Sequence, residues 1–384
     1  MKKNFAKKDH YSDEKEKIIT IITFGYPNSL TPSSYVFVEN LVSQWRKMGY
    51  KIKVINPIPK RKQKKVKIQG FNEDDCFPMY NDYLWIRNVL GLKKVQMYFM
   101  YRSIFKKVKL CFDFNTNYIY SHFLNSGFIA SKLSKITGIK SFCAFAESSL
   151  WSLNDRRRKS CLFDLNRISG FISVSKKNTQ ILIKEKICEF DKILTIPNGV
   201  DFNVFYKTDK KEMRRKMGID QGAFIGIFVG HFIYRKGLLR VDQAARDIPN
   251  LKMIYVGSGP EQPSGSNIIF KGVVKNNELR EYMAVADFFI LPTLAEGCCN
   301  AILEAMACGL PIITSNCDFN KEILNEQCAI FVDPLDINQL RTAIKTLKDN
   351  EILRNQMATI AEIKSKNYNI EDRAKIILEF IKNQ

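Results

Sequence analysis

One stretch constrains the fold of this chain more than any other: LPTLAEGCCNAILEAMACGLPIIT, residues 291–314. An apolar run from Asp287 to Leu291 predicts a buried strand, and Gly297 frees the backbone in the loop that follows. An apolar-periodic run then predicts a helix that ends at Gly309, and Pro311 opens another apolar strand. Strand, loop, helix and strand in this order are typical of the βαβ unit of a parallel sheet. The stretch therefore predicts an α/β fold.

The loop after the first of these strands holds side chains suited to a ligand, which in parallel sheets binds beyond the carboxyl ends of the strands. If Asn300 caps the helix, Glu296 in the loop and Glu304 in the helix can face one cleft. The N–H groups of residues 297–300 and the positive end of the helix dipole suit a phosphate. Ionised carboxylates accept hydrogen bonds from sugar hydroxyls. The combination predicts a site for a nucleotide sugar.

Three further motifs precede this stretch: Ile196–Asp201 (IPNGVD) with Phe205, Gly230–Gly237 (GHFIYRKG) and Val256–Pro260 (VGSGP). With the pattern E-G-x-x-N-x-x-x-E-A-M-A-x-G-x-P-x-I over Glu296–Ile312, they stand in the order and spacing of one family. The chain resembles the retaining GT-B glycosyltransferases of family 4, with their E-x7-E signature. The resemblance covers residues 190–335 best.

The resemblance implies two Rossmann-like domains that face a cleft. Residues 1–200 would bind the acceptor, and residues 201–369 would bind the nucleotide-sugar donor. The last helix, within residues 370–384, would cross back onto the first domain. The implied reaction moves a sugar from a nucleotide-diphosphate donor to an acceptor hydroxyl with retention of configuration. It needs no cofactor and no metal, and we expect a UDP-sugar rather than a GDP-sugar.

The resemblance also implies roles for residues of the second domain. Family members place an arginine directly after the glycine that matches Gly230 and a lysine five residues later; Lys236 matches, whereas His231 replaces the arginine. Arg235 can restore that charge as a bidentate phosphate donor. We therefore expect catalytic roles for Glu296, Lys236 and Arg235. The expected donor-binding residues are Glu304, Gly297, Cys298, Cys299, Asn300, Gly230, His231, Gly257 and Val273.

The acceptor side departs from the family at two loops. Family members often carry glycines in the first loop, where this chain offers Ser33 and Ser34. Many members carry a histidine where this chain has Phe145-Ala146-Glu147-Ser148. Glu147, with Ser148, is a candidate for contact with a sugar, and Glu147 can equally cap a helix. We interpret His122 as a core or strand-end residue rather than a catalytic one.

The remaining pattern alternates apolar strands with amphipathic helices. Strands are predicted at residues 18–24, 51–55, 117–123, 141–146, 170–175, 193–197, 224–229 and 252–256. Helices are predicted at residues 35–47, 126–137, 155–168, 176–186, 276–286, 337–348 and 370–382.

The net charge of +21 fits either nucleic acid or an anionic membrane surface as a partner, and the membrane fits better because no motif for nucleic-acid recognition is present. Six of the eight residues Lys60–Lys67 are basic, and Trp85–Phe112 interleaves aromatic and basic residues. On a helix that composition fits either an interfacial membrane segment or a core helix with a basic outer face. The first apolar run, Ile18–Phe24, is far shorter than the roughly 20 residues that span a bilayer. We therefore expect a cytoplasmic protein at an anionic membrane surface, with a lipid-linked glycan acceptor in capsule, exopolysaccharide or O-antigen synthesis.

Other residue types argue against a metal or a disulfide framework. The ten cysteines include no CxxC pair, and with only three histidines no metal-site spacing occurs. We expect the cysteines to be reduced, and we expect the acidic run Asn72–Asp75 to be solvated. Two rival functions remain open: a non-catalytic GT-B protein that binds a polyanion or scaffolds a polysaccharide complex, and a nucleotide-sugar epimerase or phosphorylase on the same fold.

Overall fold

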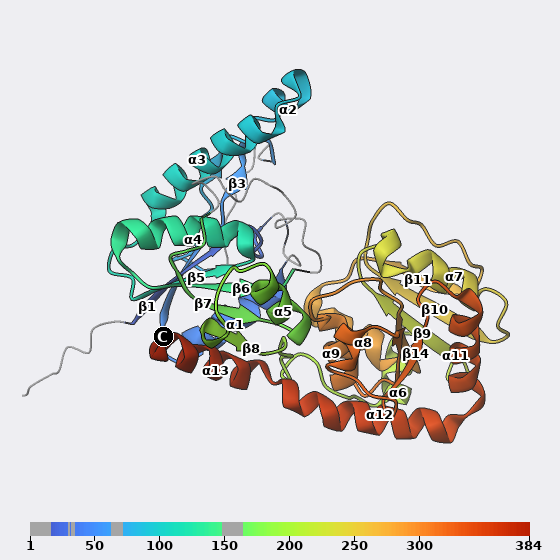
Figure 1. Cartoon of the computed structure of the whole chain (residues 1–384). Coiled ribbons are helices and arrows are strands. Elements are labelled where there is room, and N and C mark those ends of the chain that lie inside the picture. Colours follow the sequence, from blue (N-terminus) through green and yellow to red (C-terminus); the bar gives the residue numbers. More distant parts are fainter. Residues whose placement is uncertain (1–16, 30, 32–34, 63–71, 148–163) are drawn as a thin grey trace, which may run out of the picture.

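Two parallel six-stranded sheets organise the chain, and helices cover both faces of each (Figure 1). The computed structural model describes residues 17–29, 31, 35–62, 72–147 and 164–384. Both sheets are covered on two sides, so nearly all residues of their central strands are buried. The predicted α/β fold with two doubly wound sheets is confirmed.

The first sheet has the strand order β2-β1-β5-β6-β7-β8. All six residues of β1 are buried, as expected for a central parallel strand. The helices α1 (Val36–Lys47), α4 (Leu124–Thr137) and α5 (Lys176–Lys184) connect its strands. The strands are β1 (Ile18–Thr23), β2 (Lys51–Ile55), β5 (Tyr118–His122), β6 (Ser141–Phe145), β7 (Ile168–Ser173) and β8 (Ile193–Thr195).

The second sheet has the order β11-β10-β9-β12-β13-β14. Its strands are β9 (Phe224–Val229), β10 (Leu251–Val256), β11 (Ile268–Gly272), β12 (Phe288–Leu291), β13 (Ile312–Ser315) and β14 (Ala329–Val332). Its helices are α6 (Lys210–Lys216), α7 (Leu238–Ala245), α8 (Asn276–Ala284), α9 (Asn300–Ala307), α10 (Asp318–Lys321) and α11 (Ile337–Asp349). The predicted strand, loop, helix and strand of residues 287–314 are β12, α9 and β13.

The last two helices tie the sheets together. The helix α12 (Glu351–Ser365) packs on the second domain, and α13 (Ile370–Asn383) packs beside α1 on the first (Figure 1). The indole N–H of Trp45 donates to the carbonyl of Ala374 at 3.0 Å. Two backbone hydrogen bonds form where the chain crosses between the domains. The N–H of Val200 donates to the carbonyl of Tyr368 at 2.7 Å, and the N–H of Ile370 donates to the carbonyl of Val200 at 3.0 Å. The predicted crossing helix is confirmed.

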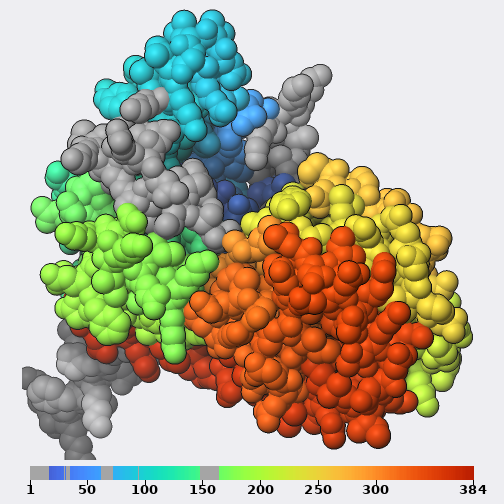
Figure 2. All heavy atoms as spheres, turned by 45° about the vertical axis from the view of Figure 1, so that its right-hand side comes forward, coloured from blue at the N-terminus to red at the C-terminus, as the bar shows by residue number. Residues whose placement is uncertain are grey.

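A helical arm projects from the first domain (Figure 1), and its outer end rises above the rest of the molecule in Figure 2. It consists of α2 (Leu84–Leu90) and α3 (Lys93–Cys111), and the short paired strands β3 (Ile58–Pro59) and β4 (Met79–Tyr80) lie at its base. The sequence suggested one helical stretch over Trp85–Phe112. Instead, Gly91 takes a φ of 66°, which L-residues rarely adopt, and ends α2 there.

Two other expectations need correction. Asp75 is not solvated, because its carboxylate accepts from Arg46 Nη2 at 2.9 Å and its side chain is 1% exposed. A helix was expected at residues 155–168. Residues 155–163 lie outside the described residues, and the last residue of the range, Ile168, begins β7 instead. Arg46 lies on α1, an element far along the chain, so sequence pattern could not reveal the ion pair.

Gly199→Ala should destabilise the domain crossing. A Cβ atom at Gly199 would lie 2.6 Å from the Cα of Ile370. The two chain segments cannot easily move apart, because backbone hydrogen bonds join Val200 to Tyr368 and Ile370. We expect a loss of about 1–3 kcal/mol, typical of overpacking, seen as a lower Tm in thermal unfolding. Gly222→Ala is the control, since only the Asp220 side chain lies nearby, at 3.8 Å. Equal Tm values for the two variants would contradict the prediction.

Candidate active site

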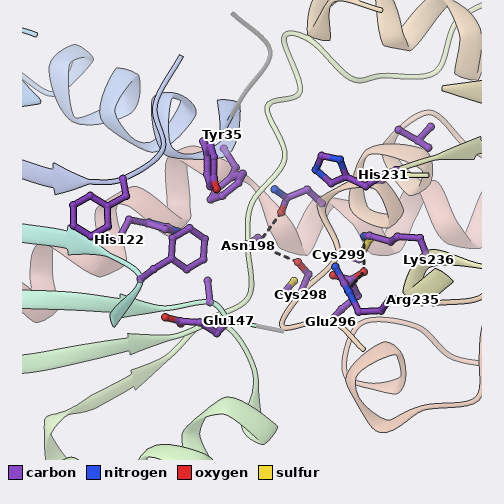
Figure 3. A pocket seen from close by; sticks show the side chains of 18 of the residues that line it. Tyr35, His122, Glu147, Asn198, His231, Arg235, Lys236, Glu296, Cys298 and Cys299 are labelled. Atoms are coloured by element: carbon purple, nitrogen blue, oxygen red, sulfur yellow. Dashed lines mark hydrogen bonds and ion pairs between the residues drawn. The ribbon is translucent and has the colours of Figure 1, made fainter. Parts of the chain in front are cut away.

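A cavity of about 740 Å³ lies between the two sheets, at the carboxyl ends of their strands (Figure 3). Residues after β1, β5 and β6 line one side, and residues after β9 and β12 line the other. Ligands of open parallel sheets bind at this edge. Of the expected site residues, the cavity brings together Glu296, Lys236, Arg235, His231, Gly230, Cys298, Cys299, Asn300 and Glu147.

A cluster of charges forms the wall of the second domain. Glu296 Oε1 accepts from Lys236 Nζ at 2.5 Å and from Arg235 Nη1 at 3.1 Å. The hydroxyl of Thr293 donates to the same oxygen at 3.0 Å. Glu296 is 9% exposed, so its charge is well shielded from water and needs these donors. The carboxylate therefore holds both cations at the mouth of the cavity.

Local backbone geometry orients the side chains of Arg235 and Lys236. They lie in a 3-10 turn, Tyr234–Lys236, that follows β9, and Gly237 ends the turn with a φ of 82°. Arg235 also donates to the carbonyl of Ala295, which joins this turn to the loop before α9. His231 follows Gly230 directly and is exposed on the same wall (Figure 3). The structure thus places Lys236 and Arg235 against Glu296, and His231 lines the same cavity.

Glycines let the strand-end loops approach one another. Gly257 has a φ of 146°, and a Cβ atom there would lie 1.9 Å from the carbonyl oxygen of Gly230. Gly257 therefore supports the loop that carries His231. Gly257 and Val273 were expected at the donor site, but neither lines this cavity, and Val273 is 62% exposed.

Gly297 lies where the two domains touch. A Cβ atom there would lie 2.9 Å from the carbonyl oxygen of Ala146 in the first domain. Close by, the amide of Asn198 donates to Asn300 Oδ1 at 2.8 Å and to the carbonyl of Cys298 at 3.2 Å. The sequence suggested Asn300 as the cap of α9, but Cys299 holds that position and Asn300 is the first helical residue. The reason is that the Asn300 side chain bonds to Asn198 rather than to its own helix.

The two cysteines in this loop are unsuited to nucleophilic catalysis. Burial raises the pKa of Cys298 to about 12 and that of Cys299 to about 11. Both thiols are therefore protonated at neutral pH, and a thiol is a much weaker nucleophile than a thiolate. Both residues line the cavity without a nucleophilic role.

Glu304 lies one turn beyond Asn300 on α9 and is half-buried. It does not line the cavity, which differs from the expectation that both acids face one cleft directly. Burial raises its pKa from 4.5 to about 7, and no hydrogen-bond partner for its carboxylate occurs in the described part of the chain. A half-buried acid without a partner can accept a hydrogen bond from a ligand.

In the first domain, Glu147 acts as a helix cap. Its Oε1 accepts from the N–H of Leu124 at 2.7 Å, at the start of α4. The other oxygen, Oε2, is buried and has no partner among the described residues, and burial raises the pKa of Glu147 to about 7. His122 was interpreted as a strand-end residue, and it is the last residue of β5. It also lines the cavity.

Other parts of the expected site cannot be placed. Ser33, Ser34 and Ser148 lie outside the described residues. Within the described ranges, no group of three histidine, cysteine, aspartate or glutamate residues is arranged to hold a metal ion. Sequence reasoning missed the roles of Thr293 and Asn198, although both lie within the quoted motifs. Thr293 stands three residues before Glu296, and Asn198 directly precedes Gly199.

Sequence comparisons agree with this geometry. Residues 209–364 match the model of the family described as glycosyl transferases group 1. A Bacillus subtilis glycosyltransferase whose name assigns it to teichuronic acid biosynthesis, TuaC, is 26% identical over 88% of this chain and 90% of its own length. An Escherichia coli UDP-Gal:alpha-D-GlcNAc-diphosphoundecaprenol alpha-1,3-galactosyltransferase is 24% identical over 70% of this chain and 74% of its own.

Solved structures share the fold at low identity. Sucrose-phosphate synthase from Thermosynechococcus elongatus superposes with a TM-score of 0.73 at 16% identity, over 96% of this chain and 99% of that one. HepE from Anabaena, in complex with UDP-glucose, gives a TM-score of 0.72 at 15% identity, over 96% and 100%. These neighbours confirm the predicted GT-B fold.

Glu304 should make stability depend on pH. Because its pKa in the folded protein, about 7, exceeds the ordinary 4.5, the native state binds more protons between these values. The free energy of unfolding should therefore fall as the pH rises from 4.5 to 7. In Glu304→Gln that fall should shrink by roughly 1–2 kcal/mol, with allowance for partial exposure. Urea unfolding at pH 5 and pH 7.5 measures it, and the exposed Glu351→Gln is the control. An unchanged pH dependence in Glu304→Gln would exclude this role.

Proposed function

We propose that this chain is a group 1 glycosyltransferase that moves a sugar from a UDP-sugar to an acceptor hydroxyl. The observation that carries the proposal is the cluster of Lys236, Arg235 and Glu296 at the carboxyl edge of the second sheet, facing the first domain across the cavity. The two cations suit the diphosphate of a donor, and the shielded carboxylate suits the hydroxyls of the sugar beside it. The match over residues 209–364 supports the same reaction class.

The charge cluster supplies the chemistry of the leaving group. As the bond between the sugar and the diphosphate breaks, negative charge grows on the phosphate oxygen, and Lys236 and Arg235 are positioned to neutralise it. Glu296 holds both cations and accepts from hydroxyls of the transferred sugar. We assign the ribose diol to Glu304, on the next turn of α9 from the cavity. With two cations in place, the proposed reaction needs no metal.

The stereochemistry follows the resemblance to family 4. The acceptor hydroxyl would attack from the face that the diphosphate leaves, and its proton would pass to the departing phosphate oxygen. The anomeric configuration is then retained and no covalent sugar–enzyme bond is needed. The names of two similar proteins support uridine as the base, because one carries UDP-Gal in its name and HepE was solved with UDP-glucose.

A lipid-linked glycan is our proposed acceptor. The Escherichia coli relative is named for a diphosphoundecaprenol-linked sugar, and a Streptococcus pneumoniae relative is named alpha-galactosylglucosyldiacylglycerol synthase. Both names describe acceptors anchored in membranes. The pathway would be the assembly of a capsule, exopolysaccharide or O-antigen at the inner face of the cytoplasmic membrane.

The helical arm supplies a surface for attachment to an anionic membrane. Trp85 is 59% exposed, Val89 76% and Leu90 53%, and exposed Arg87 and Lys93 adjoin them. Amphipathic helices with cations beside apolar side chains insert into anionic interfaces. No helix in the described part of the chain is both long and apolar enough to span a bilayer. Of the basic run, Lys60–Lys62 lie at the base of the arm, and residues 63–67 lie outside the described ranges.

Lys236→Ala should lower kcat by about 10²–10³-fold and change binding of free uridine little, since the lysine opposes charge that develops in the transition state. The assay follows UDP release and product formation from a panel of UDP- and GDP-sugars, with the anomeric configuration of the product read by NMR. Lys345→Ala, at an exposed position of α11, is the control. EDTA should leave the rate unchanged.

Four outcomes of this assay count against the proposal. Full activity in Lys236→Ala would remove the charge cluster from the mechanism. A donor that is converted without any acceptor would favour an epimerase, and a requirement for inorganic phosphate would favour a phosphorylase. Nucleotide binding without turnover of any sugar would favour a non-catalytic binding protein.

The triple variant Trp85→Ser, Val89→Ser, Leu90→Ser should bind anionic vesicles about tenfold more weakly, because it loses the apolar surface that inserts. Sedimentation with phosphatidylglycerol and with phosphatidylcholine vesicles, at low and high salt, measures the bound fraction. The matched control replaces three exposed apolar residues of the second domain: Leu335, Ile352 and Ile363. If both variants sediment like the unaltered protein, the arm is not the attachment surface.

A further inference from the structure

Four rings form the wall of the cavity that faces the charge cluster. Tyr35, Phe37, His122 and Phe123, here named the aromatic cluster, all line the cavity. Their ring centroids lie 5.9 Å apart for Tyr35–Phe37, 5.2 Å for Phe37–His122, 4.7 Å for His122–Phe123 and 6.1 Å for Phe123–Tyr35. Figure 3 shows Tyr35 and His122 on one side of the pocket and His231, Lys236 and Arg235 on the other.

The backbone of the aromatic cluster is held in unusual conformations. Tyr35 has a φ of 56° and Phe123 a φ of 71°, which L-residues with bulky side chains rarely adopt. The Tyr35 ring packs so closely on Gly25 that a Cβ atom there would lie 2.3 Å from it. Strained residues of this kind cluster at ligand sites, where the surrounding structure fixes them. Tyr35 and Phe123 therefore have backbone conformations that are unfavourable for residues of their type.

His122 brings unsatisfied polar atoms to this wall. It is 2% exposed, and neither ring nitrogen has a hydrogen-bond partner among the described residues. Buried polar atoms nearly always have partners in native proteins. Burial, with Arg373 nearby, lowers the pKa of His122 to about 3, so the imidazole is neutral and offers one donor and one acceptor. A hydroxyl group, itself a donor and an acceptor, complements it.

We propose that the aromatic cluster is the acceptor subsite and that it takes a pyranose ring, with a hydroxyl of that ring hydrogen-bonded to His122. A pyranose presents a face of C–H groups that packs on aromatic rings and an edge of hydroxyls that needs polar partners. A prenyl chain would satisfy the rings but would leave the nitrogens of His122 without partners. The proposal rests on the proposed function and assigns the sugar, rather than the lipid, of the acceptor to this wall.

The test measures binding of simple pyranosides without any donor. Saturation-transfer NMR with the methyl glycosides of glucose, galactose and N-acetylglucosamine should detect at least one of them on the unaltered protein. In Phe37→Leu and in His122→Phe the dissociation constant should rise about tenfold or more. Phe190→Leu, a 71% exposed phenylalanine of the same domain outside the cavity lining, should bind like the unaltered protein. A Tm within a few degrees verifies that each variant is folded.

Two results would overturn the proposal. One is equal pyranoside affinity in Phe37→Leu, His122→Phe and the unaltered protein. The other is absence of pyranoside binding together with binding of farnesyl phosphate that depends on Phe37, which would assign the cluster to a prenyl chain. Turnover of UDP-sugars, measured separately, distinguishes the two levels of inference. If pyranoside binding depends on the aromatic cluster but the protein turns over no UDP-sugar, only the proposed function is refuted.

Discussion

The relative placement of the two sheets depends on one backbone crossing. Val200 exchanges hydrogen bonds with Tyr368 and Ile370, and α13 then packs beside α1 through apolar residues and the Trp45 hydrogen bond. Gly199 must lack a side chain for the two chain segments to approach. Because of this crossing, the carboxyl ends of both parallel sheets face one another, and every loop that lines the cavity inherits its position from it.

Contacts across the cleft hold the domains close without filling it. Gly297 meets Ala146 backbone to backbone, Asn198 bonds to the loop before α9, and Glu322 accepts from the N–H groups of Lys176 and Lys177 at the start of α5. Carboxylates are favourable at a helix N-terminus. Each of these contacts links a segment of the second domain to the first.

The two walls of the cavity have different chemistry. The wall of the second domain carries charge, with Glu296 between Lys236 and Arg235, and suits an anionic leaving group. The wall of the first domain carries rings and neutral or raised-pKa groups, His122 and Glu147, and suits an uncharged hydroxylated ligand. A reaction between an activated anionic donor and a neutral hydroxyl needs such an asymmetric site.

The sequence by itself determined the α/β fold, most strand and helix positions, and the loop of Glu296, because apolar periodicity and glycine placement are local signals. Through the ordered motifs it also suggested Lys236 and Glu296 as site residues, but their ion pair is seen only in the structure. It missed α6, α7, α12 and β14, and it did not predict that Gly91 divides the arm. Only the tertiary structure decided that Asn198 donates a hydrogen bond to Asn300 and that Arg46 forms an ion pair with Asp75. It also decided that Tyr35, Phe37 and His122 line one wall of the cavity. Those partners come from segments far apart in the chain, and their contact depends on packing, which no local pattern encodes.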